Sequence, residues 1–338
     1  MSEFTKPGSV DEAVVSLLSD FLAARRQEAV DLDERLLVLH AELESAVRAP
    51  GKRLRPQLAC WGHRAAGATV GREMLQAAAA LELLHTFALI QDDVIDQAPT
   101  RRGRPASHVR LAGAAQSGRR DRFGESAAIL LGDLALIWSG QLLVESGFPA
   151  ERLQAGLRVY HELCAEVTLG QYLDIVVSHT DRLTEEDALR VNRYKTACYT
   201  VQRPIQLGMA LAGAPASLLD SVPGFAVPAG IAFQLRDDQL GAFGDPEVTG
   251  KPSGQDLLER KPTWLWARTL RLRPDAARLE TVPELRAAAL ESGAAAAAEA
   301  EISRLETEAL AALRAMPVAP EAESELEQLT ERLIRRNS

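Results

Sequence analysis

Apolar residues recur at intervals of three and four positions along most of the 338-residue chain, the spacing that places them on one face of an α-helix. The run Leu17, Leu18, Phe21 and Leu22 is typical. No segment alternates apolar and polar residues with β-branched side chains for long enough to predict a strand. The sequence therefore predicts an all-α fold.

Breakers rich in proline and glycine divide this pattern into successive helices, and neither a linker nor an internal repeat is visible. We therefore predict a single domain over residues 1–338, with residues 1–9 frayed. Residues 98–124 are rich in glycine, proline and arginine and are predicted to form a long active-site loop with at most one short helix, because such loops are usually functional. Helical segments are predicted within residues 10–49, 57–68, 73–97, 125–146, 151–178, 184–213, 224–243, 263–272, 283–293, 295–315 and 322–336.

The net charge of −9 argues against a nucleic-acid-binding protein, because such binding depends on a basic surface. Cys60, Cys164 and Cys198 suggest neither a disulfide framework nor a zinc site and fit a reducing cytosol, so we expect a cytoplasmic protein. We find no signal-peptide pattern and no uninterrupted apolar run of the roughly 18 residues that cross a bilayer. No transmembrane segment is therefore expected.

The predicted helix 73–97 ends in three carboxylates, Asp92, Asp93 and Asp96. Asp92 and Asp96 are four positions apart, so they share one helix face and repel each other unless a cation compensates their charge. Magnesium suits this pair because it favours one or two carboxylates together with water and substrate phosphates. A solvated helix end is the alternative interpretation.

Basic residues follow this acidic cluster closely. Arg101, Arg102 and Arg104 would bind phosphate, since guanidinium groups pair well with phosphate oxygens. His85 lies seven positions before Asp92 and shares its helix face. It fits a buried core residue and a site residue about equally well.

A second acidic pair, Asp237 and Asp238, follows Gln234 at the end of the predicted helix 224–243. Two helix-borne carboxylate clusters that face each other could hold several metal ions around one polyphosphate. Position 241, four after Asp237, is glycine, so the second cluster lacks the i,i+4 carboxylate pair of the first.

Further basic and polar groups are each weak evidence alone. Lys52, Arg53 and Arg55 lie at a predicted helix start, where backbone N–H groups favour anions, although a basic surface turn is the alternative. Gly170, Gln171 and Asp174 interrupt an apolar helix and fit a structural hydrogen bond or a site lining equally. The remaining candidates are Lys195 with Thr196, Lys251 and Lys261.

The sequence shows neither a Ser/His/Asp or Cys/His pattern for covalent catalysis nor a glycine-rich nucleotide loop. Carboxylates for magnesium, cations for at least two phosphates and apolar helix interiors suit an apolar molecule that carries a diphosphate. Magnesium and the basic residues would stabilise diphosphate as a leaving group. A carbocation would then form in a pocket that excludes water.

The motifs, in their order along residues 45 to 270, resemble those of the trans-isoprenyl diphosphate synthases of the polyprenyl synthetase family. They are most similar to those of bacterial geranylgeranyl and farnesyl diphosphate synthases. The motifs are Gly-Lys-Arg-Leu-Arg-Pro at 51–56, Asp-Asp-x-x-Asp at 92–96, Arg-Arg-Gly-Arg-Pro at 101–105, Gly-Gln-x-x-Asp at 170–174, Lys-Thr at 195–196, Phe-Gln-x-x-Asp-Asp at 233–238, Gly-Asp-Pro at 244–246, Thr-Gly-Lys at 249–251 and Lys-x-Thr at 261–263.

The resemblance implies an all-α helical bundle of the isoprenoid synthase type with a central active-site cavity, usually assembled as a homodimer. It implies a magnesium-dependent prenyltransferase that joins isopentenyl diphosphate to an allylic diphosphate (dimethylallyl, geranyl or farnesyl). The allylic diphosphate would ionise, the isopentenyl double bond would attack, and a proton would leave to the departing diphosphate.

The resemblance also assigns roles to residues of this chain. The diphosphate of isopentenyl diphosphate would be held by Lys52, Arg55, His85 and Arg102. The allylic diphosphate would be surrounded by Arg101, Lys195, Thr196, Gln234, Lys251 and Lys261. Magnesium would be carried by Asp92, Asp96 and Asp237, with Asp93 and Asp238 nearby in the metal site. The catalytic set would be Asp92, Asp96, Asp237 and Lys195.

The chain departs from the family pattern at two positions. Gly241 replaces the last aspartate of the second motif, in a variant similar to that of active actinobacterial members. Arg260, before Lys261, stands where many members have glycine.

Product length in this family depends on side chains four and five positions before the first acidic motif, here Ala88 and Phe87. This pair resembles geranylgeranyl diphosphate synthases, and farnesyl diphosphate is the alternative product. A class I terpene cyclase would need an Asn/Asp-x-x-Ser/Thr-x-x-x-Glu motif near the second cluster. A non-catalytic partner subunit would tend to lose the first motif. Both remain as less favoured alternatives.

Overall fold

The computed structural model describes residues 9–180, 182–244 and 254–335. The chain divides into two compact units: the first comprises Met1–Arg64 and Ala68–Leu157, and the second comprises Ala65–Gly67 and Arg158–Ser338. Each unit is described by itself. A single domain with a central cavity therefore stays a prediction.

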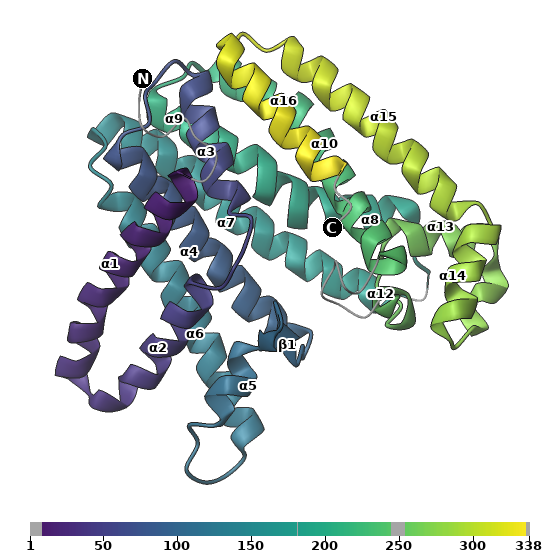
Figure 1. The fold of residues 1–338 in the computed structure, drawn as a ribbon, viewed down its shortest axis with the longest axis horizontal. Helices are drawn as coiled ribbons and strands as arrows, with labels where there is room; N and C mark the ends of the chain where they lie inside the picture. Colours follow the sequence, from purple (N-terminus) through teal and green to yellow (C-terminus); the bar gives the residue numbers. More distant parts are fainter. Residues whose placement is uncertain (1–8, 181, 245–253, 336–338) are drawn as a thin grey trace. The chain divides into compact units, whose positions relative to one another are not determined.

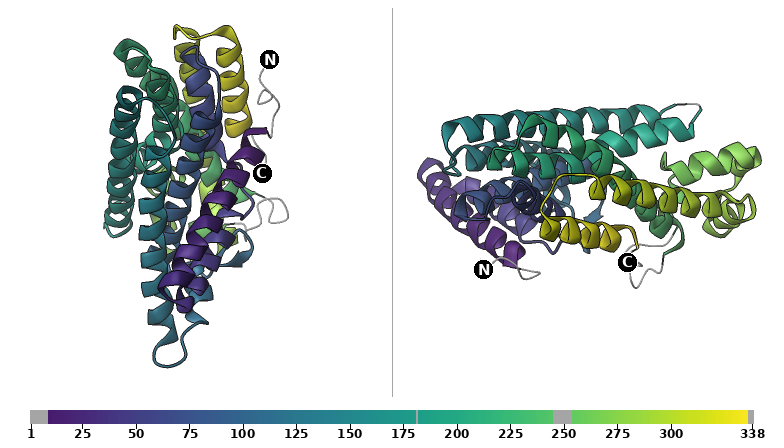
Figure 2. Two further views of the ribbon diagram at one scale, coloured as in Figure 1. Left: turned by 90° about the vertical axis from the view of Figure 1, so that its left-hand side faces the viewer. Right: turned by 90° about the horizontal axis from the view of Figure 1, so that it is seen from above.

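The first unit is a layer of helices around α4 (Arg72–Ile95). α4 packs along α6 (Arg120–Val144), and α1 (Ser9–Leu32) packs against α4 (Figures 1 and 2). The run Ala77–Ala80 of α4 is fully buried, and such small side chains allow helices to approach closely. The other elements are the 3-10 helix η2 (Glu34–Leu36), α2 (Leu37–Val47), α3 (Leu54–Ala65), the strands β1 (Thr100–Arg101) and β2 (Arg104–Pro105), and α5 (Ser107–Ala112).

The helix α7 (Ala150–Ser178) begins in the first unit and ends in the second. In the second unit α10 (Ala216–Phe243) packs against α15 (Ala294–Arg314) and the π-helix η3 (Asn192–Gln202). The remaining elements are α8 (Glu185–Val191), α9 (Arg203–Ala212), α12 (Gln255–Leu258), α13 (Trp264–Leu272), the 3-10 helix η4 (Pro274–Arg278), α14 (Val282–Glu291) and α16 (Pro320–Ile334).

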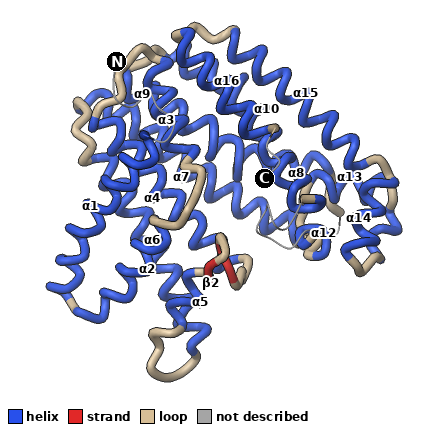
Figure 3. Tube along the Cα trace, in the orientation of Figure 1, coloured by secondary structure: helices blue, strands red, loops and turns tan. Residues whose placement is uncertain are grey.

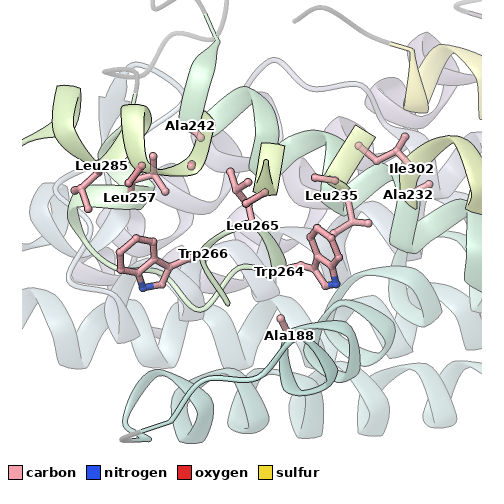
Figure 4. Close-up of a cluster of buried hydrophobic side chains, with 14 of the residues drawn as sticks. Ala188, Ala232, Leu235, Ala242, Leu257, Trp264, Leu265, Trp266, Leu285 and Ile302 are labelled. Carbon is pink, nitrogen blue, oxygen red and sulfur yellow. The ribbon is translucent and has the colours of Figure 1, made fainter. Parts of the chain in front are cut away.

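The core of the second unit gathers side chains from several of these helices. Trp266 lies near Leu257 and Leu285, and Trp264 lies near Leu235, as Figure 4 shows. These residues are at most 5% exposed. Burying two indole rings contributes several kcal/mol of hydrophobic stabilisation, roughly 1.5–3 kcal/mol for each large side chain. The core fixes α12 and α13 against the end of α10.

The prediction of an all-α fold is confirmed, but the prediction of one long loop over residues 98–124 is wrong. The strands β1 and β2 pair as an antiparallel hairpin (Figure 3), α5 follows it, and α6 already begins at Arg120. Each strand is only two residues long, too short for an alternating pattern to reveal. Among the described residues this hairpin is the one sheet.

Two predicted helices also differ from those observed. The helix predicted over 184–213 is divided by the π-helix η3, and the helix predicted over 224–243 begins earlier, at Ala216. Pro223 and Pro228 lie inside α10, where each proline removes a backbone hydrogen bond. Phe225 and Ala226 between them are fully buried, so tertiary packing outweighs the local helix-breaking tendency.

Three helices among the described residues, α4, α6 and α10, are long and apolar enough to cross a membrane by length and composition alone. The expectation of no transmembrane segment used uninterrupted apolar runs, whereas these helices contain polar residues within a broadly apolar window. That window is 67% buried in α4, 39% in α6 and 50% in α10. A core helix of a bundle has the same composition, so this property does not indicate a membrane span.

Candidate active site

The C-terminal end of α4 carries the first acidic cluster. Asp93 is buried and Asp92 is half-buried. Arg101 binds both: its Nε donates to Oδ1 of Asp93 at 2.7 Å, and a terminal nitrogen donates to Oδ2 of Asp92 at 2.9 Å. Burial raises the pKa of the Asp93 carboxyl, while the hydrogen bond from Arg101 opposes this. Asp96 caps the helix with an exposed side chain, one turn after Asp92.

Arg102 and Gly103 form the turn of the hairpin, with φ of 53° and 72°. Positive φ at both residues of a two-residue turn matches the twist of the paired strands. Arg104, on the second strand, donates to the backbone oxygen of Ser45 at 2.9 Å and also to its hydroxyl. The guanidinium of Arg104 thus anchors the hairpin to α2, while that of Arg101 is directed to the acidic cluster.

A basic cluster lies around His85, farther back along α4. The guanidinium of Arg102 lies against Gly51, 2.9 to 3.1 Å from where a Cβ would be. Burial lowers the pKa of His85 well below its usual value, and the charges of Arg55 and Arg102 lower it further. The imidazole is therefore neutral at physiological pH and can donate a hydrogen bond to an anion. Lys52 is exposed in the turn before α3.

A buried ion pair between Arg53 and Glu82 ties this basic turn to α4. The nitrogen–oxygen distance is 2.5 Å, and the two side chains are 6% and 5% exposed. Arg53 also donates to the backbone oxygen of Val47 at 3.0 Å. The second carboxylate oxygen of Glu82 has no hydrogen-bond partner among the described residues, and burial raises the pKa of this carboxyl. The pair holds the turn from which Lys52 and Arg55 project.

Phe87 and Ala88, the predicted chain-length residues, are half-buried on α4. A pocket of about 50 Å³ in the first unit is lined by Leu89, Asp93 and Arg101, among others, but by neither of these two residues. Their role in limiting the product therefore stays a prediction.

In the second unit, Lys195 of η3 forms an ion pair with Asp174 of α7. Nζ lies 2.6 Å from Oδ2, and the side chains are 28% and 23% exposed. A Cβ on Gly170 would lie 2.6 to 2.9 Å from the backbone of Tyr194 and Lys195, so this close approach requires glycine. The two interpretations of the Gly170–Asp174 motif thus combine, since Asp174 makes a structural contact to a predicted site residue.

A short chain of hydrogen bonds joins Thr196 to the second acidic pair. Thr196 Oγ1 donates to Oε1 of Gln234 at 2.8 Å, and Gln234 Nε2 donates to Oδ1 of Asp238 at 2.9 Å. Asp238 is 8% exposed, and its Oδ2 has no partner among the described residues. Burial, with the charges of Asp237 and Asp256, raises the pKa of Asp238 to about 8, although the Gln234 hydrogen bond lowers it.

Asp238→Asn is expected to stabilise the metal-free protein. The folded-state pKa of Asp238 lies near 8 and its reference value is 3.8. Below the reference value both states hold the proton, but as pH rises toward 8 only the unfolded state releases it, so wild-type stability falls. Melting in EDTA should give a midpoint raised by roughly 2–6 °C at pH 8 and little change at pH 4. A difference independent of pH would contradict this.

Lys261 also has a defined environment. Its Nζ lies 2.7 Å from Oδ1 of Asp256 and 3.7 Å from Glu259. Arg260, where many family members have glycine, adopts φ of 53°, and its guanidinium donates to the backbone oxygen of Leu279 at 2.7 Å. The left-handed turn is thus retained with arginine, which leaves Lys261 directed to Asp256. Lys251 lies outside the described residues, and its role stays a prediction.

The donor chemistry of both clusters fits magnesium. Within the described ranges, no three His, Cys, Asp or Glu side chains gather closely enough to form a metal cage. Magnesium does not require one, because it is held by one or two carboxylates with water and phosphate oxygens. Asp92 and Asp96 on one face of α4, and the unpartnered Oδ2 of Asp238, are ligands of this kind.

Comparison with known proteins identifies the family. The polyprenyl synthetase family model matches residues 37–299, which is more than half of the chain. The chain belongs to the polyprenyl synthetase family. A crystal structure of geranylgeranyl pyrophosphate synthase from Corynebacterium glutamicum, complexed with isoprenyl diphosphate and magnesium, is similar with a TM-score of 0.93 and 35% identity. The match covers 98% of this chain and 99% of that one.

Curated members of the family with different products are about equally similar. Geranylfarnesyl diphosphate synthase of Aeropyrum pernix is 33% identical over 65% of this chain and 66% of its own length. (2E,6E)-Farnesyl diphosphate synthase of Mycobacterium bovis is 33% identical over 63% of this chain and 55% of its own length. This polyprenyl synthetase therefore spans less than two thirds of these curated relatives, and their identities do not distinguish a product length.

Two residues that organise the site were not among the sequence predictions. Glu82 is a charged residue within the apolar run before His85, and that contrast was the available signal. Asp256, five positions before Lys261, looks like an ordinary acidic residue in a turn-rich segment. Only the folded structure shows that each pairs with a residue of a predicted motif.

Proposed function

We propose that this polyprenyl synthetase condenses isopentenyl diphosphate with an allylic diphosphate to form an all-trans short-chain prenyl diphosphate, with geranylgeranyl diphosphate as the main product. The observation that carries the proposal is the similarity over 99% of the length of a geranylgeranyl pyrophosphate synthase that was crystallised with isoprenyl diphosphate and magnesium. The clusters of acidic and basic residues in each unit support it.

The basic cluster of the first unit would bind the diphosphate of isopentenyl diphosphate. Lys52, Arg55 and Arg102 supply positive charge, and neutral His85 supplies a hydrogen-bond donor. The buried Arg53–Glu82 pair keeps the turn in place before the substrate arrives. Preorganised donors of this kind lose little free energy to rearrangement when the anion binds.

The allylic diphosphate would be bound by a second set of donors. Arg101 is held on Asp92 and Asp93, and Lys195 is held on Asp174, so both cations are fixed by carboxylates. The other members of the set are Thr196, Gln234, Lys251 and Lys261. We propose that Asp92, Asp96 and Asp237, with Asp93 and Asp238, hold magnesium, which when bound would neutralise the developing charge of the departing diphosphate.

The reaction follows from this division of roles. Cations around the allylic diphosphate favour breakage of its carbon–oxygen bond, and the isopentenyl double bond attacks the resulting cation. The proton that is then lost passes to the departing diphosphate. Asp92, Asp96, Asp237 and Lys195 act by stabilising charge, so no side chain of this chain is required as a general base.

An incorporation assay tests the proposal. The purified chain is incubated with magnesium, isopentenyl diphosphate and, in turn, dimethylallyl, geranyl or farnesyl diphosphate, and the products are sized. We expect incorporation of isopentenyl units up to a C20 product. Cyclised product without isopentenyl incorporation would identify a terpene cyclase instead. No incorporation with any primer would overturn the proposal and leave the partner-subunit alternative.

Replacement of Phe87 by alanine is expected to lengthen the product. In the proposal its ring limits the growth of the hydrocarbon, so its removal makes room for at least one further five-carbon unit. Chromatography of the products made from farnesyl diphosphate measures this. Phe123→Ala is the matched control, because Phe123 is 46% exposed on α6. An unchanged product distribution in the Phe87 variant would rule out its role.

We include a homodimer in the proposal. Phe123, Leu130, Ile137 and Val144 lie seven positions apart on α6, and each is between 46% and 65% exposed. A seven-residue interval places them along one side of the helix. A second copy of the chain would bury this apolar stripe. A reducing cytoplasmic location is also proposed, because Cys60 and Cys198 are buried thiols and no disulfide is needed to hold the described helices.

A further inference from the structure

The space beside Gly241 is filled by a carboxylate from another element. A Cβ on Gly241 would overlap Oδ2 of Asp256 and lie 3.2 Å from its Cγ. Asp256 belongs to α12, and the N–H of Gly254 just before α12 donates to the backbone oxygen of Gly241 at 2.8 Å. A carboxylate therefore reaches the side of α10 at the point where a side chain of residue 241 would begin.

The position of Asp256 is fixed by the core of the second unit. Its neighbour Leu257 is 2% exposed and lies near Leu285 and Trp266 in Figure 4. Arg286 of α14 donates to the backbone oxygen of Ala242 at 2.7 Å, which ties α14 to α10 beside Gly241. These contacts hold α12 against the end of α10, so the approach of Asp256 is built into the fold.

The neighbouring Asp238 carries an unsatisfied oxygen. Gln234 occupies Oδ1, whereas Oδ2 has no hydrogen-bond partner within the described ranges, although the residue is 8% exposed. A buried, unpartnered carboxylate oxygen is costly unless a ligand satisfies it. The charges of Asp237 and Asp256 both act on Asp238. A cation is the ligand that would relieve all three carboxylates.

We propose that Asp256 supplies from α12 the carboxylate that Gly241 omits from α10, so that Asp237, Asp238 and Asp256 together hold a hydrated magnesium ion. The inference rests on the proposed function and adds one metal-binding residue to it. Gly241 is then a requirement of the site and not a loss, because any side chain there would displace Asp256. Magnesium retains several waters in such sites, so three carboxylates on two elements suit it.

The competing explanation is that Asp256 serves only to hold Lys261, with which it forms an ion pair. The two explanations differ in sign. If Asp256 binds the metal, removal of its negative charge weakens metal affinity, whereas removal of the positive charge of Lys261 strengthens it. If Asp256 only positions Lys261, the two substitutions act in the same direction.

Manganese binding measures this without reference to catalysis. Mn²⁺ prefers oxygen ligands as Mg²⁺ does and is titrated by electron paramagnetic resonance into full-length chain whose first cluster is silenced by Asp92→Asn and Asp96→Asn. Asp256→Asn should weaken Mn²⁺ binding by about tenfold or more, in the range seen when metal-site residues are altered. Lys261→Met should tighten it. Glu259→Gln is the matched control and should leave it unchanged, because Glu259 is 48% exposed and 3.7 Å from Lys261.

Unchanged Mn²⁺ affinity in a folded Asp256→Asn variant would overturn the proposal, as would a loss of affinity shared by Lys261→Met. The double variant Gly241→Asp, Asp256→Gly returns the carboxylate to α10 and should recover affinity relative to Asp256→Gly alone. A folded double variant without recovery would also count against the proposal. Absence of isopentenyl incorporation by the wild-type chain would overturn the proposed reaction and leave this metal site standing.

Discussion

Asp92→Asn should lower kcat for isopentenyl incorporation by roughly 10²- to 10³-fold, the loss expected when several kcal/mol of metal-dependent charge stabilisation is removed. In the proposed site Asp92 and Asp96 share one magnesium ion across one turn of α4. Asparagine keeps the size of the side chain and removes the charge, so the metal loses a ligand that water does not replace in kind. Steady-state assays with geranyl diphosphate at saturating magnesium measure the change.

The same variant should fold almost normally. Arg101 retains its ion pair with Asp93, so the unfolding free energy should change by less than about 1 kcal/mol. Asp20→Asn, on the exposed side of α1, is the matched control and should leave both kcat and stability unchanged. A variant that keeps wild-type kcat, or loses activity only because it unfolds, would exclude Asp92 from the metal site.

Glu82→Ala should destabilise the protein by roughly 3–5 kcal/mol, the usual cost of removing one member of a buried ion pair. The substitution leaves the guanidinium of Arg53 buried, with only the backbone oxygen of Val47 as a printed partner distance of 3.0 Å. Chemical denaturation followed by circular dichroism measures the change in unfolding free energy.

Glu44→Ala provides the comparison for this second effect. Glu44 pairs with Arg48 at 2.8 Å, but the side chains are 26% and 56% exposed, so its removal should cost no more than about 0.5 kcal/mol. Replacing Arg53 and Glu82 together by methionine should recover most of the loss, because no charge is then buried alone. Equal effects of Glu82→Ala and Glu44→Ala would show that the buried pair does not stabilise the turn.

Much of the fold could be predicted because helical periodicity is a local signal. The helix predicted at 151–178 corresponds to α7 over Ala150–Ser178, since its apolar spacing is uninterrupted. The hairpin at Arg101–Arg104 could not be predicted in this way, because its two-residue strands are held by side chains such as Arg104 on Ser45. The π-helix η3 escaped prediction for a similar reason: its close approach to Gly170 is a tertiary contact.

The candidate site followed the same rule. Motif residues that carry charge on one helix end, such as Asp92 and Asp93, could be assigned from spacing alone. The contact of Asp256 with Lys261 and the fit of Asp256 beside Gly241 depend on how α12 packs, which spacing does not encode. Gly241 therefore looked like a missing ligand in the sequence, although it is a point of close approach in the structure.

The hairpin has a consequence for how the two substrates influence each other. Arg101 and Arg102 are consecutive residues, yet one side chain binds Asp92 and Asp93 and the other lies against Gly51. With a turn of only two residues between paired strands, a shift of one arginine backbone moves the other. Occupancy at either side should therefore alter affinity at the other by the same factor, since thermodynamic linkage is reciprocal.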